Sequence, residues 1–354
     1  MQSYGNIGNL LIKHCNKYPL LQIRDIFKFL YQSTFGCEHM ISSDDNVLIY
    51  IKNEFELSAS TTPAECDLLS DEFSRVGLSY LKRGISPETL AKLFVLSSKK
   101  NMGTKEELES KIRTAAELVK DEVLPFSEND FQNSLALWKE AGYPPVHHSD
   151  AFKASYNPSY RVISNDFIPF LPLFAEIDKR LKNGRLRVAL DGRSASGKST
   201  LSKLLEEIYG CTVFHMDDFF LRPEQRTDER FAQIGGNIDH ERFLEDVLLP
   251  LNEGKNINYR RFDCSEMKLL SPVSIIPSDL IVTEGVYSMH PEMAEYYDFS
   301  VFLEISPDLQ KSRILKRNSP EIAKRFFDEW IPLENRYFEY EKIKDKCDIV
   351  IEIK

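Results

Sequence analysis

The sequence predicts an α/β protein in which a mainly α-helical N-terminal domain precedes a parallel β-sheet with flanking helices. Three observations predict this organisation. Apolar residues before residue 160 recur at helical spacing without a strong alternating pattern, whereas apolar strand-like runs alternate with helices after it. A glycine-rich turn between one such run and a helix lies at residues 192–200. A length of 354 residues suits two domains, which we expect at residues 1–160 and 161–354.

The composition argues against several classes of protein. A net charge of −10 disfavours a general nucleic-acid binder. The six cysteines form no Cys-x-x-Cys pair, so we expect free thiols in a reducing cytoplasm. The first residues lack the basic and apolar regions of a signal peptide, and no apolar run approaches the roughly 18 residues of a membrane span. We therefore expect a cytoplasmic protein without nucleic-acid or membrane partners, and the sequence leaves open whether it forms a homo-oligomer.

Helix signals are frequent in the N-terminal domain. Ser86 before Pro87 is an N-cap signal, and Thr104 followed by Glu107 reads as a capping box. The expected helices are 7–32 (broken near Pro19), 46–57, one from 87 onward, 104–119 and 127–141. Residues 142–160 are rich in turn and aromatic residues and are expected to connect the domains. An amphipathic linking helix is expected at about 167–182.

Strand-like apolar runs dominate the C-terminal domain. Runs of this kind, bounded by turn residues and separated by helices, are typical of a parallel sheet covered on both faces. The expected strands are 186–191, 212–216, 280–283, 300–305 and 348–353, with helices at 201–208 and 242–249.

The glycine-rich turn has the pattern G-x-x-x-x-G-K-S between a strand and a helix, which is the context of a phosphate-binding P-loop. Its backbone N–H groups and the helix N-terminus favour the phosphates of ATP. Lys198 is expected to reach the β- and γ-phosphates, and the Ser199 hydroxyl is expected to bind Mg²⁺. The predicted nucleotide-binding residues are Gly192, Arg193, Ser194, Ala195, Ser196, Gly197, Lys198, Ser199 and Thr200.

Two acidic positions follow predicted strands. Asp217 and Asp218 come after the second strand, and Glu284 comes after the third. Ligands of open parallel sheets bind at the carboxyl ends of the strands, so these acids are expected beside the P-loop. One is expected to accept the proton of an attacking hydroxyl and the other to support Mg²⁺, which makes Asp217 and Glu284 both catalytic and metal candidates. The alternative is that they are exposed turn residues.

A basic helix follows the strand 300–305. Arg313 and Arg317 lie one turn apart on it, and arginines near a triphosphate neutralise charge on the transferred phosphoryl group. Both are therefore catalytic candidates. The alternative is a solvated basic helix face.

The order of these motifs resembles that of uridine kinases and their relatives, which include nicotinamide riboside kinases, phosphoribulokinases and type I pantothenate kinases. The resemblance covers about residues 185–354 and implies a P-loop NTPase-type kinase domain for a small acceptor. It implies that Asp217 is the catalytic base, that Glu284 lies near the metal, and that Asp239 holds ribose hydroxyls. Arg313 and Arg317 match an arginine-bearing lid. The matching segments are 192–200, 216–220, 237–240, 283–285, 313–325 and 347–351.

The chain departs from the family pattern in the substrate region. The family shows a histidine there that contacts the base, but this sequence has none between His240 and His290. Arg261 and Asp263 are expected either to contact the substrate instead or to form a structural ion pair. The sequence therefore predicts an ATP- and Mg²⁺-dependent kinase whose small-molecule acceptor is a nucleoside such as uridine. The alternatives are another acceptor (nicotinamide riboside, pantothenate or another alcohol) or an ATP-binding regulatory module without catalysis.

The N-terminal domain resembles an extension of some bacterial uridine kinase-like proteins, and this resemblance implies no activity. Its polar candidates are residues 37–39 (Cys-Glu-His) and the pair His147-His148. They are a weak metal-site candidate, because adjacent histidines point in different directions on regular structure. Surface or interdomain contacts are the favoured interpretation.

Overall fold

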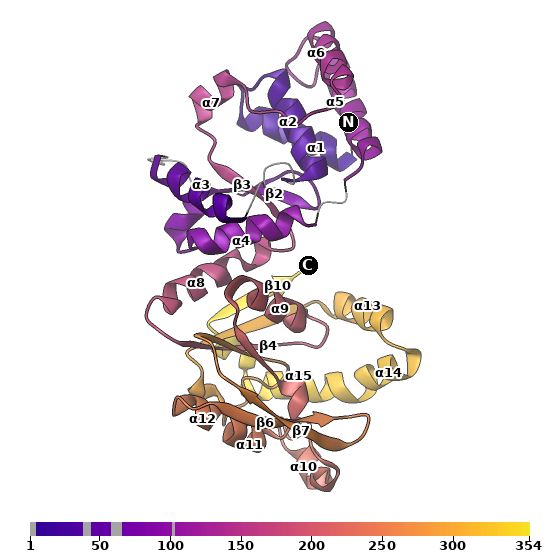
Figure 1. Cartoon of the computed structure of the whole chain (residues 1–354). Coiled ribbons are helices and arrows are strands. Elements are labelled where there is room, and N and C mark those ends of the chain that lie inside the picture. The colour runs from indigo at the N-terminus through magenta and orange to yellow at the C-terminus, as the bar shows by residue number, and fades with distance from the viewer. Residues whose placement is uncertain (1–4, 38–43, 58–65, 101–102) are drawn as a thin grey trace. The chain divides into compact units, whose positions relative to one another are not determined.

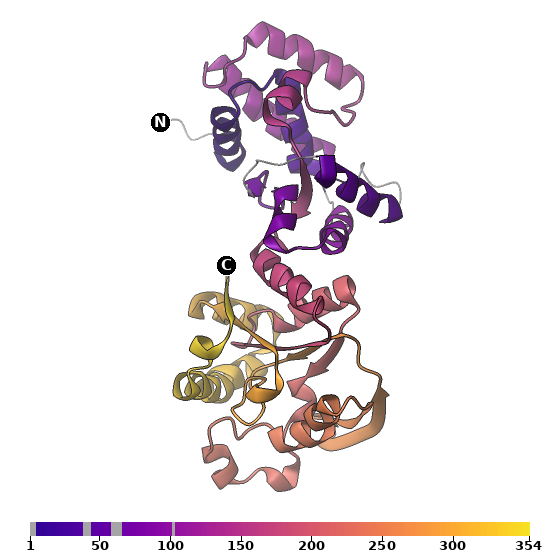
Figure 2. The same ribbon diagram turned by 90° about the vertical axis from the view of Figure 1, so that its left-hand side faces the viewer.

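The computed structural model describes residues 5–37, 44–57, 66–100 and 103–354 (Figures 1 and 2). The chain divides into unit 1, which ends at Asp178, and unit 2, which begins at Lys179. This division falls later than residue 160, where the sequence suggests it. The reason is that the strand β3 (Tyr160–Ser164) pairs with another strand of unit 1.

Helices make up most of unit 1, as predicted. Ser86, Thr104 and Ser127 each cap a helix by accepting the backbone N–H of the residue three positions on. The chain breaks near Pro19 between the first two helices, also as predicted. The helices are α1 (Gly5–Lys17), α2 (Ile23–Phe35), α3 (Asp44–Leu57), α4 (Pro87–Ser98), α5 (Lys105–Lys120), α6 (Glu128–Glu140) and α7 (Asp150–Tyr156), with 3₁₀ turns at Leu78–Arg83 and Ile168–Phe170. Helix α8 (Leu171–Leu181) begins in unit 1 and contains the boundary at Asp178.

Unit 1 also contains an antiparallel sheet that the sequence did not predict. Its order is β1 (Cys66–Leu68), β2 (Phe73–Gly77) and β3. The central strand β2 is buried on both faces, so it lacks the alternation of apolar and polar residues that marks a half-exposed strand. This sheet and helices α1 to α7 form a layered unit (Figure 1).

A buried polar network ties α2 to the segment before α7. Asp25 is fully buried and accepts the backbone N–H of Ser149 at 3.0 Å and its hydroxyl at 2.6 Å. His148 contacts Asp25 through Nδ1 (2.8 Å) and the Tyr160 hydroxyl through Nε2 (2.6 Å). Its ring stacks on Phe152 at a centroid distance of 4.2 Å. These contacts give His148 a structural role.

Only some of the metal-site candidates of unit 1 belong to the described residues. His148 is buried, whereas the neighbouring His147 is exposed, so the two side chains lie in different surroundings. Glu38 and His39 lie outside the described residues. Across the described ranges, no group of three or more His, Cys, Asp or Glu side chains is arranged to hold a metal ion.

Unit 2 is built on a five-stranded parallel sheet with the order β10-β9-β4-β8-β5, which confirms the predicted α/β class. Each predicted strand is present, and the strand that leads into the P-loop, β4, is central. The strands are β4 (Leu186–Gly192), β5 (Thr212–His215), β8 (Leu280–Glu284), β9 (Phe299–Ile305) and β10 (Ile349–Ile353). Because all five run in one direction, their carboxyl ends meet at one edge.

Helices lie on both faces of this sheet (Figure 2). The helix predicted at 242–249 is part of one continuous helical segment with a π-turn in its middle. The helical elements are α9 (Lys198–Tyr209), α10 (Asp228–Ala232), α11 (His240–Phe243), the π-turn Leu244–Leu248, α12 (Leu249–Asn252), α13 (Pro307–Arg317), α14 (Pro320–Arg325), the π-turn Phe326–Trp330, α15 (Ile331–Glu341) and α16 (Ile343–Lys346), with 3₁₀ turns at Met216–Phe219, Pro223–Gln225 and Ala294–Tyr296.

A β-hairpin of β6 (Ile257–Asp263) and β7 (Lys268–Ile275) lies between α12 and β8, and the sequence did not predict it. Ile257, Tyr259 and Phe262 are its buried residues. A bulge between Arg260 and Phe262 shifts the pairing register by one residue and interrupts the alternation that would reveal the strand.

Among the described parts of the chain, none of the helices has the length and apolar character that crossing a membrane requires.

Candidate active site

The P-loop connects β4 to α9 and adopts a conformation that depends on its glycines. Gly192 has φ +144° and Gly197 has φ +101°, both in the region that favours glycine. Ala195 also has a positive φ of +61°, so the backbone turns sharply at three points between the strand and the helix. Lys198 is buried and its ammonium donates to the carbonyls of Gly192 (2.7 Å) and Arg193 (3.0 Å).

Gly192→Ala is expected to destabilise the protein by about 3 kcal/mol or more. A Cβ at this position would overlap the backbone carbonyl oxygen of Leu303 on β9, and the positive φ adds strain. The measurement is urea unfolding followed by circular dichroism. Gly254→Ala is the matched control, because Gly254 also has a positive φ (+70°) but has open space at its Cβ position. Equal losses in the two variants would contradict the overlap argument.

The strand register brings Glu284 to the P-loop. In the sheet, Glu284 pairs with Leu190 of β4 on one side and His215 of β5 on the other. Its Oε1 accepts the Ser199 hydroxyl at 3.0 Å and lies 2.6 Å from His215 Nδ1. The hydrogen bond that the Glu284 carboxylate accepts raises the pKa of His215 above its usual value. The structure therefore brings two of the predicted metal candidates into contact.

Asp217 lies in the 3₁₀ turn directly after β5. Protein atoms crowd its carboxylate, although the side chain still reaches solvent. Desolvation and then the negative charge of Glu284 raise the pKa of Asp217, while Lys198 acts in the opposite direction. A carboxylate with a raised pKa that remains open to solvent suits a group that exchanges a proton.

The residues at this edge fit Mg²⁺ only together with further oxygen ligands. The Ser199 hydroxyl and the Glu284 carboxylate are hard oxygen donors in contact, and Asp217 is a third acidic oxygen donor nearby. Mg²⁺ in kinases usually takes one or two protein carboxylates and completes its shell with phosphate oxygens and water. The donor set therefore suits a metal that arrives with a triphosphate.

Asp191, the residue before the P-loop, is a functional candidate that the sequence analysis missed. It is fully buried and accepts the N–H groups of Gly192 (2.7 Å) and Met289 (3.0 Å) and the Tyr337 hydroxyl (2.9 Å). Burial raises its pKa to about 6 against the effect of these hydrogen bonds and of Lys198. Its contacts fix the backbone at the entry to the loop.

The basic helix α13 packs against the P-loop through only part of its length. Gln310 donates to the Ser194 carbonyl at 3.0 Å, and Arg313 Nη1 donates to the Ala195 carbonyl at 3.2 Å. Arg317 lies one turn further along and is exposed. Of the two predicted arginines, the structure brings Arg313 to the loop, and Arg317 stays apart from it.

Helix α15 supplies contacts that no sequence motif suggested. The Glu334 carboxylate accepts the backbone N–H of Ser194 at 3.0 Å and also bonds its hydroxyl. Asn335 accepts from Arg193 Nη1 at 2.5 Å. In the sequence these contacts correspond only to the polar pair Glu334-Asn335 followed by Tyr337. Such residues are common on any exposed helix, so the sequence alone could not identify them as contacts of the P-loop.

The predicted substrate residues have mixed placements. Asp239 is buried and caps α11, accepting the N–H of Arg242 at 3.3 Å. Asp263 accepts three donors from Ser265 and Glu266 in the β6–β7 turn. Arg261 is half exposed, and its Nε lies 3.4 Å from Asp218.

The ion-pair alternative for Arg261 and Asp263 is therefore wrong as stated, because Arg261 pairs with Asp218 while Asp263 serves its own turn. Arg261 lies in the bulge of β6, and Asp263 pairs with Lys268 at the end of the strand. Arg261 keeps an exposed guanidinium beside the Asp217-Asp218 turn. It is the predicted substrate residue that this geometry leaves most open to a ligand.

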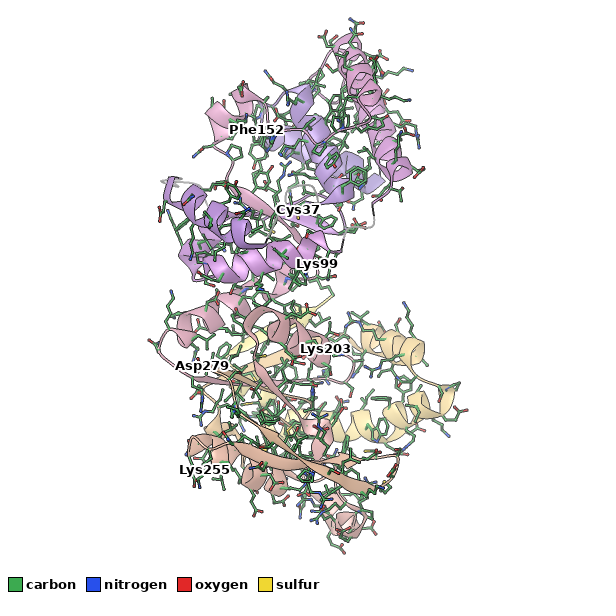
Figure 3. All side chains as sticks on the ribbon, viewed as in Figure 1. Cys37, Lys99, Phe152, Lys203, Lys255 and Asp279 are labelled. Carbon is green, nitrogen blue, oxygen red and sulfur yellow. The ribbon has the colours of Figure 1, made fainter. Side chains whose placement is uncertain are left out.

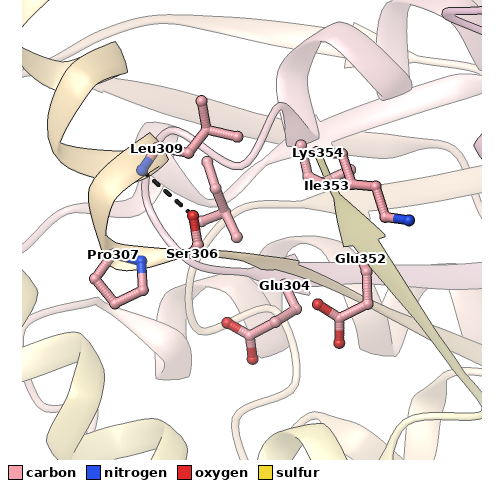
Figure 4. Close-up of a pocket in the computed structure, with 8 residues that line it drawn as sticks. Glu304, Ser306, Pro307, Leu309, Glu352, Ile353 and Lys354 are labelled. Atoms are coloured by element: carbon pink, nitrogen blue, oxygen red, sulfur yellow. Dashed lines mark hydrogen bonds between the residues drawn. The ribbon is translucent and has the colours of Figure 1, made fainter. Parts of the chain in front are cut away.

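A hollow of about 610 Å³ lies at the carboxyl ends of β9 and β10 (Figure 4). Its apolar lining includes Ile305, Pro307, Leu309 and Ile353. Glu304 lines it as well and accepts from Arg193 of the P-loop at 2.6 Å. The hollow is therefore next to the phosphate-binding loop.

Comparison with known families gives one match. Residues 188–325 match the model of the phosphoribulokinase/uridine kinase family. The matched segment contains the P-loop, Asp217, Asp239, Glu284 and the arginines of α13. It spans less than half of the chain and lies within unit 2.

Several solved structures match about half of this chain. A structure described as a possible uridine kinase from Bacillus stearothermophilus is 25% identical, with 51% of this chain and 98% of that chain covered and a TM-score of 0.38. A candidate fructose transport system kinase from a Silicibacter species is 21% identical, with coverage of 47% and 89% and a TM-score of 0.37. Shikimate kinase from Bacteroides thetaiotaomicron is 15% identical, with coverage of 48% and 86% and a TM-score of 0.26.

Proposed function

We propose that this chain, a uridine kinase-like P-loop kinase over residues 188–325, transfers the γ-phosphoryl group of ATP to a hydroxyl of a small acceptor such as uridine. The observation that carries the proposal is the contact of Glu284 with Ser199 of the P-loop, beside the open carboxylate of Asp217. A protein that binds a nucleotide without catalysing a reaction needs the P-loop but has little need for two acidic residues next to it. Phosphoryl transfer needs both, one for the metal and one for the hydroxyl.

Each residue has a distinct proposed role. Ser199 and Glu284 would hold Mg²⁺, which would supply positive charge beside the phosphates when bound. Asp217 orients the acceptor hydroxyl and takes its proton. Lys198 stabilises the β- and γ-phosphates, and Arg313, with Arg317 as the second candidate, neutralises charge on the transferred group.

For Lys198 this role requires a rearrangement of its side chain. Its ammonium bonds two carbonyls of the loop in the present structure. A bound triphosphate offers it a negatively charged partner, and the attraction between opposite charges adds to the hydrogen bond in a poorly hydrated site. The ammonium is therefore expected to turn toward the phosphates when ATP binds.

The hollow beside β9 and β10 is the proposed site for the adenine base of ATP. Its apolar side chains suit a flat aromatic ring, and Ser306 and three charged residues, Glu304, Glu352 and Lys354, also line it. The ion pair of Glu304 with Arg193 links the rim of the hollow to the P-loop. One molecule of ATP could thus contact the hollow through its base and the loop through its phosphates.

Two of the predicted substrate carboxylates already have partners within the protein. Asp239 is engaged as a helix cap and Asp263 as a turn residue, so neither offers a free carboxylate for ribose hydroxyls. For this reason nicotinamide riboside, pantothenate and other alcohols remain candidate acceptors in addition to uridine. The alternative that is not an enzyme is a regulatory module that binds ATP without turnover.

The deciding experiment measures ADP release with ATP, Mg²⁺ and a panel of acceptors that includes uridine, cytidine, nicotinamide riboside and pantothenate. We expect one of them to raise ADP release well above the rate without acceptor. ATP binding by calorimetry without acceptor-dependent release for any compound would favour the regulatory module. No ATP binding at all would contradict both.

A further inference from the structure

Helix α15 contacts the entry and first half of the P-loop through three neighbouring side chains. Tyr337 donates its hydroxyl to Asp191, Asn335 accepts from Arg193, and Glu334 bonds Ser194. The Glu334 contact differs from the other two because it places a carboxylate on the phosphate-binding loop. Its oxygens accept hydrogen bonds from both the backbone N–H and the hydroxyl of Ser194.

The surroundings of Glu334 are those of a buried anion with cations nearby. The side chain is only 5% exposed, and the positive charges that act on it most strongly are Lys198 and Arg193. Burial nevertheless raises its pKa above the usual glutamate value. Lys198 is also the residue proposed to reach the β- and γ-phosphates, so Glu334 lies on that side of the loop.

In P-loops the phosphate oxygens accept hydrogen bonds from backbone N–H groups, a hydroxyl and a lysine ammonium. These are the same kinds of group that surround the Glu334 carboxylate. We propose that Glu334 is an internal anion that competes with the β- and γ-phosphates of the nucleotide for the P-loop at Ser194. Without a nucleotide the carboxylate holds the loop. A triphosphate has to displace it, because two negative groups in one poorly hydrated place repel each other.

This inference deepens the proposed function and rests on the nucleotide binding assumed there. It makes Glu334 a residue that sets nucleotide affinity and selects for ligands with enough phosphates to displace it. A purely structural interpretation gives the opposite expectation. If Glu334 only shapes the loop, then weakening its contact loosens the loop and lowers affinity.

The test compares Glu334→Gln with the wild-type chain by calorimetric titration with ATP and Mg²⁺ and, separately, with AMP. Glutamine keeps the size and an acceptor oxygen for the Ser194 N–H but removes the charge. We expect ATP to bind about tenfold more tightly to the variant, while AMP, which lacks the β- and γ-phosphates, changes little. Glu339→Gln is the matched control, because Glu339 is an exposed acid on the same helix.

Unchanged or weaker ATP binding to Glu334→Gln would overturn the proposal, and so would an equal gain for ATP and AMP. Thermal unfolding checks that the variant is folded, and Glu334→Ala provides a second removal of the charge with the same expected direction. If neither the wild-type chain nor any variant bound ATP, the proposed function itself would fail. That outcome is distinct from normal ATP binding that Glu334 does not influence.

Discussion

Lys198→Ala is expected to abolish acceptor-dependent ADP release, with a fall in kcat of about a thousandfold or more. Phosphoryl transfer depends on positioning and on neutralising charge, and this ammonium is the cation that the P-loop itself contributes. Loss of one preorganised donor to a transition state costs a factor of hundreds in other enzymes, and a full positive charge is worth more than a neutral donor. The measurement is steady-state kinetics with the best acceptor of the panel.

The control for this variant is Lys203→Ala, which removes an exposed lysine from the same helix α9 (Figure 3). It should keep normal turnover. Circular dichroism and thermal unfolding should show that Lys198→Ala keeps its fold, although the carbonyls of Gly192 and Arg193 lose a donor. Near-normal phosphorylation by a folded Lys198→Ala protein would refute the proposed mechanism.

Asp217→Asn is expected to lower kcat by about a hundredfold to ten-thousandfold while ATP binding is preserved. An amide can still accept a hydrogen bond from the acceptor hydroxyl, but it cannot take up the proton. Because desolvation and Glu284 raise the pKa of Asp217, the wild-type rate should fall as the pH drops through that raised value. The variant should lack this acidic limb, which a pH–rate profile would show.

Asp279→Asn is the control for Asp217→Asn. Asp279 is an exposed aspartate before β8, at the amino end of that strand, and its loss should leave turnover unchanged (Figure 3). Unchanged turnover in Asp217→Asn would move the base role to Glu284. Glu284→Gln should then lose the acidic limb, and a raised Mg²⁺ requirement without that loss would instead indicate a metal role.

Much of unit 2 could be predicted from the sequence because its signals are local. The strand before the P-loop, the glycines at 192 and 197 and the helix after them are adjacent in the chain, and their conformations follow from residue type. The approach of Glu284 to Ser199 was also predictable. Parallel strands bring their carboxyl ends to one edge whatever their spacing in the chain. Residues 188–325 match the model of the phosphoribulokinase/uridine kinase family, which agrees with the resemblance carried by the order of the sequence motifs.

The strands of unit 1 and the β6–β7 hairpin show where local signals are too weak. β2 is buried on both faces, and β6 carries a bulge, so neither has the period-two pattern that a strand with one solvent face shows. These segments form strands because each pairs with another strand of the chain. In the case of β2 and β3, Phe73 pairs with Ser164, a partner that no local window can contain.

By itself the sequence determined that a triphosphate-binding loop, two acids and an arginine helix belong to one parallel sheet. Only the tertiary structure decided which polar groups are already engaged. It commits Asp239 to a helix cap and Asp263 to a turn, and it brings Glu334 to the P-loop over 140 residues of chain. The physical reason is that residue type and spacing fix backbone conformation. The partner of a buried carboxylate, in contrast, is fixed by whichever donors the packed elements bring within about 3 Å of it.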